Sequence, residues 1–124
     1  MASTPEGKVK EACKRYLKGL GAWYFMPVSN GMGQVGIPDI IGCYKGRFLA
    51  IETKAPGKRG NTTPNQERVI EAIQKADGWA IVVDNVDQLH EFIVAINMYD
   101  ILENGNAQID TQKTRVSKSI QRSP

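Results

Sequence analysis

Apolar residues recur at three- and four-residue spacing between positions 6 and 20, with lysines placed between them. This period is typical of an amphipathic helix that packs one face against a core. Thr4-Pro5-Glu6 supplies a capping side chain, a proline for the first turn and an acid at the helix N-terminus. Gly19 and Gly21 are the expected stop signals. The pattern therefore predicts a first helix over this stretch.

Three shorter apolar runs follow, at residues 23–28, 37–44 and 47–55, and they are rich in β-branched and aromatic side chains. Runs of this length and composition are typical of strands. Only Lys45-Gly46 separates the last two runs, and such a short link predicts a β-hairpin. A glycine-dense loop over residues 29–36 leads into this hairpin.

The second half of the chain predicts helix, strand and helix. Thr63 is placed to cap a helix, Pro64 takes its first position, and Gln66 follows as the partner in a capping box. A strand is expected over residues 79–84, and Asn85 then caps a third helix. The buried stripes expected for the two helices consist of Val69, Ile70, Ile73 and Ala76, and of Leu89, Phe92, Ile93 and Ile96.

The element order α-β-β-β-α-β-α predicts an α/β fold with a mixed β-sheet. The hairpin supplies antiparallel pairing, and a right-handed crossover through the second helix supplies a parallel pair. A chain of 124 residues suits one compact domain. We place this single domain at residues 1–102 and interpret residues 103–124 as a polar to basic C-terminal arm.

Charge is unevenly distributed along the chain. The formal net charge is +3, but residues 111–124 carry four basic side chains and no acid. The remaining 110 residues hold 12 of the 16 basic side chains and all 13 acidic ones, a net of −1. A basic tail on a near-neutral body suits a polyanionic partner, although many termini are simply solvated.

The sequence shows neither a membrane or secretory signal nor a cysteine spacing typical of a zinc site or disulfides. No apolar run approaches the roughly 20 residues that span a bilayer, and the N-terminus lacks the apolar core of a secretory signal. Cys13 and Cys43 are too few and too far apart in sequence for a zinc site or a disulfide framework. We therefore expect reduced, structural cysteines and an intracellular, cytoplasmic protein.

The hairpin register brings candidate chemistry together. If Lys45-Gly46 forms a two-residue turn, Asp39 falls opposite Glu52, with β-carbons about 4.5–5.5 Å apart. A four-residue turn keeps this register, whereas a three-residue turn breaks it. Glu52 and Lys54 are two residues apart on one strand and point to the same face. The register thus predicts two acids and one lysine at a single place.

Such a set suits a divalent cation and a phosphate. Magnesium binds one or two carboxylates and accepts phosphate oxygens, and the carbonyl of Thr53 is a further candidate ligand. The same Glu-x-Lys pattern also describes an ordinary surface ion pair. Glu6-Gly7-Lys8 repeats it, but residues two apart on a helix do not share a face, so we reject that copy.

Two segments, Gly36-Ile37-Pro38-Asp39-Ile40-Ile41-Gly42 and Phe48-Leu49-Ala50-Ile51-Glu52-Thr53-Lys54, resemble the PD-(D/E)xK nuclease superfamily. More narrowly, the chain is similar to the VRR-NUC family of virus-type and bacterial stand-alone nucleases. Thr63-Pro64-Asn65-Gln66 and the Gly78–Val83 segment also match, so the similarity runs from about residue 6 to residue 92. The resemblance implies a restriction-endonuclease-like core and dependence on Mg²⁺, with Mn²⁺ as a substitute.

The resemblance also implies roles for individual residues. Asp39 and Glu52 would be metal ligands, Lys54 the catalytic lysine and Gln66 a supporting catalytic residue. Glu6 matches the family's acid near the start of the first helix, which completes the metal site. The alternatives are a favourable helix N-terminal acid for Glu6, with Glu11 as the reserve ligand, and a capping role alone for Gln66.

Nucleic-acid contacts are expected from two loops. Asn30 and Gly31 lie in the glycine-rich loop, where backbone can approach a ligand closely. Lys58 and Arg59 follow Lys54 and are suited to phosphate contacts. The glycine-rich loop could instead be an ordinary connection that does not contact DNA. Lys58 and Arg59 could instead lie in a solvated loop without phosphate contacts.

These features predict a magnesium-dependent endodeoxyribonuclease. Stand-alone members of the family resemble Holliday-junction resolvases, so we expect a homodimer that cuts branched DNA. One alternative is a nonspecific or sequence-specific nuclease that cuts linear DNA. The alternative from another class is a DNA-binding module without catalysis.

Overall fold

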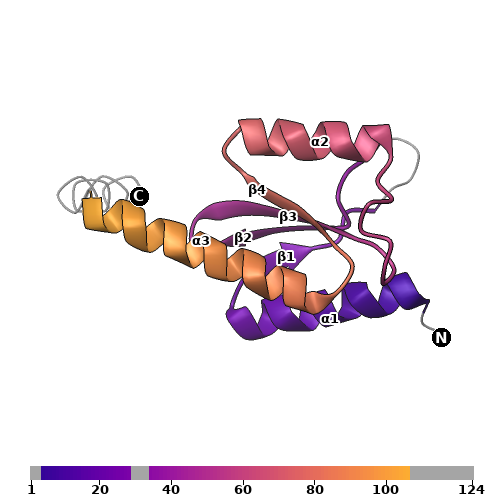
Figure 1. Ribbon diagram of the computed structural model, residues 1–124, viewed down its shortest axis with the longest axis horizontal. Helices are drawn as coiled ribbons and strands as arrows, with labels where there is room; N and C mark the ends of the chain where they lie inside the picture. Colours follow the sequence, from indigo (N-terminus) through magenta and orange to yellow (C-terminus); the bar gives the residue numbers. More distant parts are fainter. Residues whose placement is uncertain (1–3, 29–33, 107–124) are drawn as a thin grey trace, which may run out of the picture. The chain divides into compact units, whose positions relative to one another are not determined.

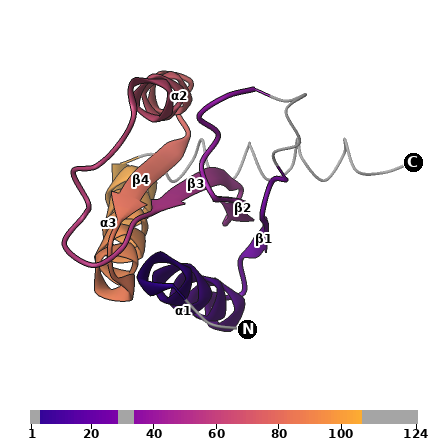
Figure 2. The ribbon, with the colours of Figure 1, turned by 90° about the vertical axis from the view of Figure 1, so that its right-hand side faces the viewer.

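The computed structural model describes residues 4–28 and 34–106, and the elements follow the expected order. Contacts divide the chain into two units, residues 1–90 and 91–124. The first unit contains a four-stranded sheet with helix α1 on one side and helix α2 on the other (Figures 1 and 2). The expected α/β class with a mixed sheet is confirmed.

Helix α1 (Pro5–Leu20) begins and ends where its caps dictate. The Thr4 hydroxyl accepts a hydrogen bond from the Gly7 amide at 2.9 Å, as expected for an N-cap. Gly21 takes the left-handed conformation at φ 84° and closes the helix. Gly19 lies inside the helix, so its expected role as a stop signal was wrong. The buried face of α1 consists of Val9, Cys13 and Leu17.

The sheet order is β1-β2-β3-β4. Strands β2 (Ile40–Tyr44) and β3 (Arg47–Thr53) form the hairpin, and Tyr44 pairs with Arg47. Lys45 and Gly46 have φ of 51° and 78°. Positive φ at both central residues is the mark of a tight two-residue turn whose twist matches the strands. The register expected from the sequence is therefore confirmed.

Strand β1 (Trp23–Phe25) is an edge strand and is shorter than the expected 23–28 run. It pairs antiparallel with β2 through three residues, ending at Phe25 opposite Ile41. Pro27 lacks an amide hydrogen and cannot extend the ladder. On the other side of the hairpin, β4 (Trp79–Val83) pairs with β3 in parallel, and α2 connects the two strands.

Helix α2 (Pro64–Lys75) has the complete capping box expected from its first residues. Its buried stripe is narrower than expected: Val69 is buried, Ile70 and Ile73 are half-buried, and Ala76 is exposed. The reason is a groove of about 630 Å³ between α2 and the sheet. Ile73 and Ala76 line this groove and do not pack in a closed core.

Helix α3 (Val86–Asn106) begins in the first unit and makes up the described part of the second. The Asn85 side chain accepts a hydrogen bond from the Gln88 amide at 3.0 Å, as expected for its cap. Of its expected inward residues, Leu89, Ile93 and Ile96 are buried and Phe92 is half-buried. No helix in the described part of the chain is long and apolar enough to cross a membrane.

Candidate active site

The end of the β2–β3 hairpin carries the two acids and the lysine. Glu52 lies in β3 and is 4% exposed, whereas Asp39 immediately precedes β2. The register pairs Ile40 with Ile51, and one further step along it places Asp39 opposite Glu52. Lys54 directly follows β3, on the same side of the strand as Glu52. The structure thus brings together the three residues on which the sequence interpretation rests.

Asp39 is held by backbone and side-chain donors. Its Oδ2 accepts hydrogen bonds from the Thr53 amide at 2.9 Å and from the Thr53 hydroxyl at 2.7 Å. Its Oδ1 lies 3.7 Å from the Nζ of Lys10, a residue of α1. One carboxylate oxygen is therefore fixed to β3, while the other lies near the ammonium of Lys10 on α1.

Glu52 shares its surroundings with Lys54 and Gln66. Its Oε2 accepts a hydrogen bond from the Gln66 Nε2 at 3.0 Å and lies 3.4 Å from the Lys54 Nζ. The Gln66 Oε1 in turn accepts from the Lys54 Nζ and from the Thr63 amide, both at 3.0 Å. The capping box and the site contacts proposed for Gln66 therefore exist together, because its Oε1 accepts from both Thr63 and Lys54 while its Nε2 donates to Glu52.

Burial raises the pKa of the Glu52 carboxyl from 4.5 to about 7. This value already includes a smaller rise caused by the nearby Asp39 charge and the opposing effect of the charge and hydrogen bond of Lys54. The Oε1 of Glu52 is buried and has no hydrogen-bond partner among the described residues. An ionised carboxylate with one unpaired buried oxygen is costly and needs a further positive partner.

These residues fit a small divalent cation. The Glu52 Oε1 and the Asp39 Oδ1 are hard oxygen donors, which Mg²⁺ and Mn²⁺ prefer. Among the described residues, no group of three Asp, Glu, His or Cys side chains is placed to bind a metal ion. Two carboxylates are nevertheless a common complement for Mg²⁺, which takes its remaining ligands from water and phosphate.

Other residues expected from the sequence are placed less directly. Glu6 lies in the first turn of α1, and its carboxylate makes no hydrogen bond or ion pair with another described residue. The reserve ligand, Glu11, forms an ion pair with Lys14 at 3.0 Å. Asn30 and Gly31 lie outside the described residues. The metal role of Glu6 remains a prediction.

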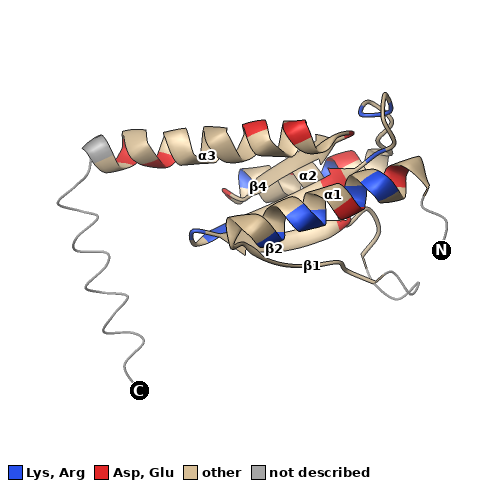
Figure 3. Cartoon of the chain, turned by 90° about the horizontal axis from the view of Figure 1, so that it is seen from below, with Lys and Arg blue, Asp and Glu red and all other residues tan. Residues whose placement is uncertain are grey.

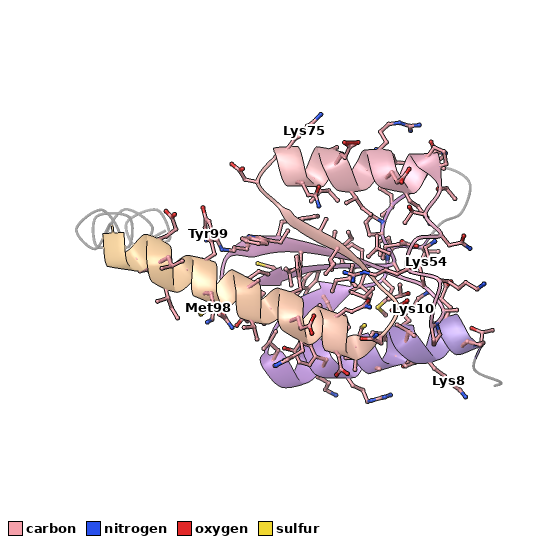
Figure 4. All side chains as sticks on the ribbon, viewed as in Figure 1. Lys8, Lys10, Lys54, Lys75, Met98 and Tyr99 are labelled. Carbon is pink, nitrogen blue, oxygen red and sulfur yellow. The ribbon has the colours of Figure 1, made fainter. Side chains whose placement is uncertain are left out.

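Sequence reasoning missed Lys10. It follows Glu6 by four residues, so the two side chains share one face of α1. Figure 4 labels Lys10 and Lys54 at the same end of the sheet, whereas Lys8 points away from it. The signal was present in the helical period, but only the tertiary packing shows that this face meets Asp39.

The site also depends on a close backbone contact at Gly36. This residue has φ 87°, and an added Cβ would lie 2.5 Å from the Asn65 carbonyl oxygen and 2.9 Å from the Gln66 nitrogen. Only glycine accommodates both the conformation and the approach. Gly36 therefore abuts the first turn of α2, which carries Gln66.

Gly36→Ala should consequently lower the free energy of unfolding by about 1–3 kcal/mol and displace Gln66 from Glu52. Thermal or urea denaturation measures the first effect. Gly60→Ala is the matched control, because nothing lies within 4 Å of its added Cβ. Equal stability of the two variants would contradict this role for Gly36.

The fold and the site define a class of protein: an α/β domain in which a hairpin presents an acid pair and a lysine in the PD-(D/E)xK arrangement. Scans against models of protein families and against curated proteins each found no match. A search of solved structures found a chain described as a VRR_NUC domain, with a TM-score of 0.58 and 26% sequence identity. The match covers 73% of this chain and 96% of the other. This likeness over most of both chains supports assignment of the chain to the VRR-NUC family.

Proposed function

We propose that the chain is a metal-dependent DNA endonuclease that hydrolyses phosphodiester bonds. The observation that carries this proposal is the buried Glu52 Oε1, which has no hydrogen-bond partner among the described residues, in a carboxylate whose other oxygen lies 3.4 Å from the Lys54 Nζ. A purely structural ion pair would not require an unpartnered oxygen at the end of the sheet. An intracellular nuclease that acts on DNA would explain why Asp39, Glu52 and Lys54 lie together and why the chain is similar to a VRR_NUC domain.

Asp39 and Glu52 are the proposed holders of Mg²⁺, with the Thr53 carbonyl and Glu6 as further candidates. When bound, the ion would neutralise charge on the scissile phosphate and lower the pKa of a bound water. The Nζ of Lys54 orients the attacking water and stabilises the developing phosphate charge. Gln66 keeps Lys54 and Glu52 in place, since it bonds to both.

DNA recognition is proposed to rely on the phosphate backbone. Figure 3 shows basic residues along α1 and on the loop that joins β3 to α2. Lys10 lies beside Asp39, and Lys58 and Arg59 are exposed on that loop. Contacts of this kind position a duplex without reading its sequence. They suit recognition by DNA shape, and branched DNA such as a Holliday junction is the proposed substrate.

A homodimer would present two such sites to a near-symmetric junction. Support comes from exposed apolar side chains of the sheet: on β1, Trp23 is 65% exposed and Phe25 44%, and on β3, Phe48 is 46% exposed. Phe25 and Phe48 also line the groove beside α2. Exposed apolar surface of this kind commonly marks an association site. Sedimentation of the purified chain tests this, and a monomer at all accessible concentrations would contradict it.

The substrate is tested by comparing a four-way junction with linear duplexes of the same arms, with Mg²⁺, Mn²⁺ or chelator. We expect faster cutting of the junction with either ion and no cutting with chelator. Equal cutting of linear DNA would favour a nonspecific or sequence-specific nuclease. Binding without cutting under every condition would favour a non-catalytic DNA-binding module.

A further inference from the structure

A second buried acid, Asp84, follows β4 and is 8% exposed. Its Oδ2 accepts hydrogen bonds from two backbone amides of the loop after Lys54, those of Gly57 at 3.1 Å and Arg59 at 3.3 Å. Its Oδ1 accepts from the Gln88 Nε2 at 2.8 Å. The two carboxylate oxygens therefore have separate tasks, one toward the loop and one toward α3.

The loop that Asp84 holds, residues 55–62, is otherwise built from short turns. The Lys58 amide bonds to the Ala55 carbonyl, and the Asn61 amide bonds to the Lys58 carbonyl, both at 2.9 Å. The Arg59 Nε donates to the Val82 carbonyl at 2.7 Å. These contacts fix an exposed loop directly after the site lysine, at a place where surface loops are normally mobile.

Lys58 is the residue that this arrangement presents to solvent. Its side chain is exposed, and its ammonium has no hydrogen-bond or ion-pair partner within residues 4–28 and 34–106. Arg59, by contrast, uses its side chain on the open edge of β4. A rigid backbone beneath an unpaired ammonium reduces the entropy lost when that ammonium binds a phosphate.

We propose that Asp84 is a positioning residue that holds Lys58 against the DNA backbone next to the cleaved phosphate. This proposal rests on the proposed nuclease function and adds a determinant of substrate binding to it. Asp84 would therefore strengthen DNA binding, although its own negative charge repels DNA. Removing an acid near DNA should strengthen binding electrostatically, whereas releasing Lys58 should weaken it.

Asp84→Ala and Lys58→Ala test the proposal through binding to a DNA junction in chelator and through cutting with Mg²⁺. Each variant should weaken Kd and raise KM about tenfold, with kcat within about twofold of wild type. The slope of log Kd against log salt should fall by about 0.9, the value for one lost phosphate contact. The double variant should resemble either single one, since both remove one contact. Asp87→Ala, an exposed acid three residues away, should bind no more weakly than wild type.

Hydrogen exchange at the Gly57 and Arg59 amides supplies a readout independent of cutting. Protection should fall about tenfold or more in Asp84→Ala and stay unchanged in Lys58→Ala. Should Asp84→Ala fail to fold, Asp84→Asn serves instead. If the side-chain oxygen of the new asparagine faces the loop, its NH2 group faces the Gln88 Nε2, so that two hydrogen-bond donors meet. Adding Gln88→Glu supplies an acceptor and should restore binding.

Loss of amide protection with unchanged Kd and salt slope would overturn the proposal, because Asp84 would then only stabilise the fold. Additive losses in the Asp84→Ala/Lys58→Ala double variant would also overturn it. A wild-type chain that binds DNA but never cuts contradicts the nuclease function alone, and the Kd measurements still decide the role of Asp84.

Discussion

Lys54→Ala should cut DNA roughly 10²–10⁴-fold more slowly than wild type, while binding the same DNA with a Kd within about threefold. The Lys54 Nζ lies 3.4 Å from the Glu52 Oε2 and 3.0 Å from the Gln66 Oε1, so its loss removes the ammonium beside Glu52. The side chain is largely buried, which limits its contribution to nonspecific DNA attraction. Single-turnover cutting and binding in chelator measure the two quantities.

Lys75→Ala is the matched control for this prediction. Lys75 ends α2, and Figure 4 shows its side chain pointing away from the sheet. Its loss should change neither cutting nor binding by more than about twofold. Undiminished cutting by Lys54→Ala would remove the lysine from the chemistry and with it the proposed arrangement.

Glu52→Gln should abolish cutting and, at pH 8 without metal, stabilise the fold. The pKa of Glu52 is raised from 4.5 to about 7, so the folded chain binds this proton more tightly than the unfolded chain does. Because its carboxyl pKa is raised, the contribution of Glu52 to the free energy of unfolding is most favourable below pH 4.5 and is lost as the pH rises to 7 and above. At pH 8 the free-energy cost of the buried, ionised Glu52 in the folded chain is fully present and is on the order of 3 kcal/mol at most.

The glutamine variant avoids this cost because it carries no charge. We expect its free energy of unfolding to exceed that of wild type by about 1–3 kcal/mol at pH 8, with the difference vanishing near pH 4.5. Added Mg²⁺ should stabilise wild type and leave the variant unchanged. Urea denaturation across pH measures both effects, and a variant less stable than wild type at pH 8 would contradict this account of Glu52.

The sequence predicted the local features of the site well. Lys45-Gly46 dictates a tight turn, and that turn sets the register that brings Asp39 opposite Glu52. The capping box likewise fixes where α2 begins and hence where Gln66 lies. Such features depend on a few adjacent residues and can therefore be inferred from one sequence.

Contacts between distant segments could not be inferred in the same way. Lys10 meets Asp39, and Asp84 meets Gly57, because helices and loops pack together across the fold. The expected burial of Ala76 was wrong for a related reason: helical period indicates which face is apolar but not whether anything covers it. Tertiary packing decides both matters.

Mn²⁺ titration by calorimetry tests most directly whether Asp39 and Glu52 hold one divalent cation. We expect one Mn²⁺ per wild-type chain, with binding weakened about tenfold or more in both Asp39→Asn and Glu52→Gln. Glu11→Gln, which alters an exposed acid paired with Lys14, should bind as wild type does. Equal Mn²⁺ affinity in wild type, Asp39→Asn and Glu52→Gln would contradict the proposed metal site.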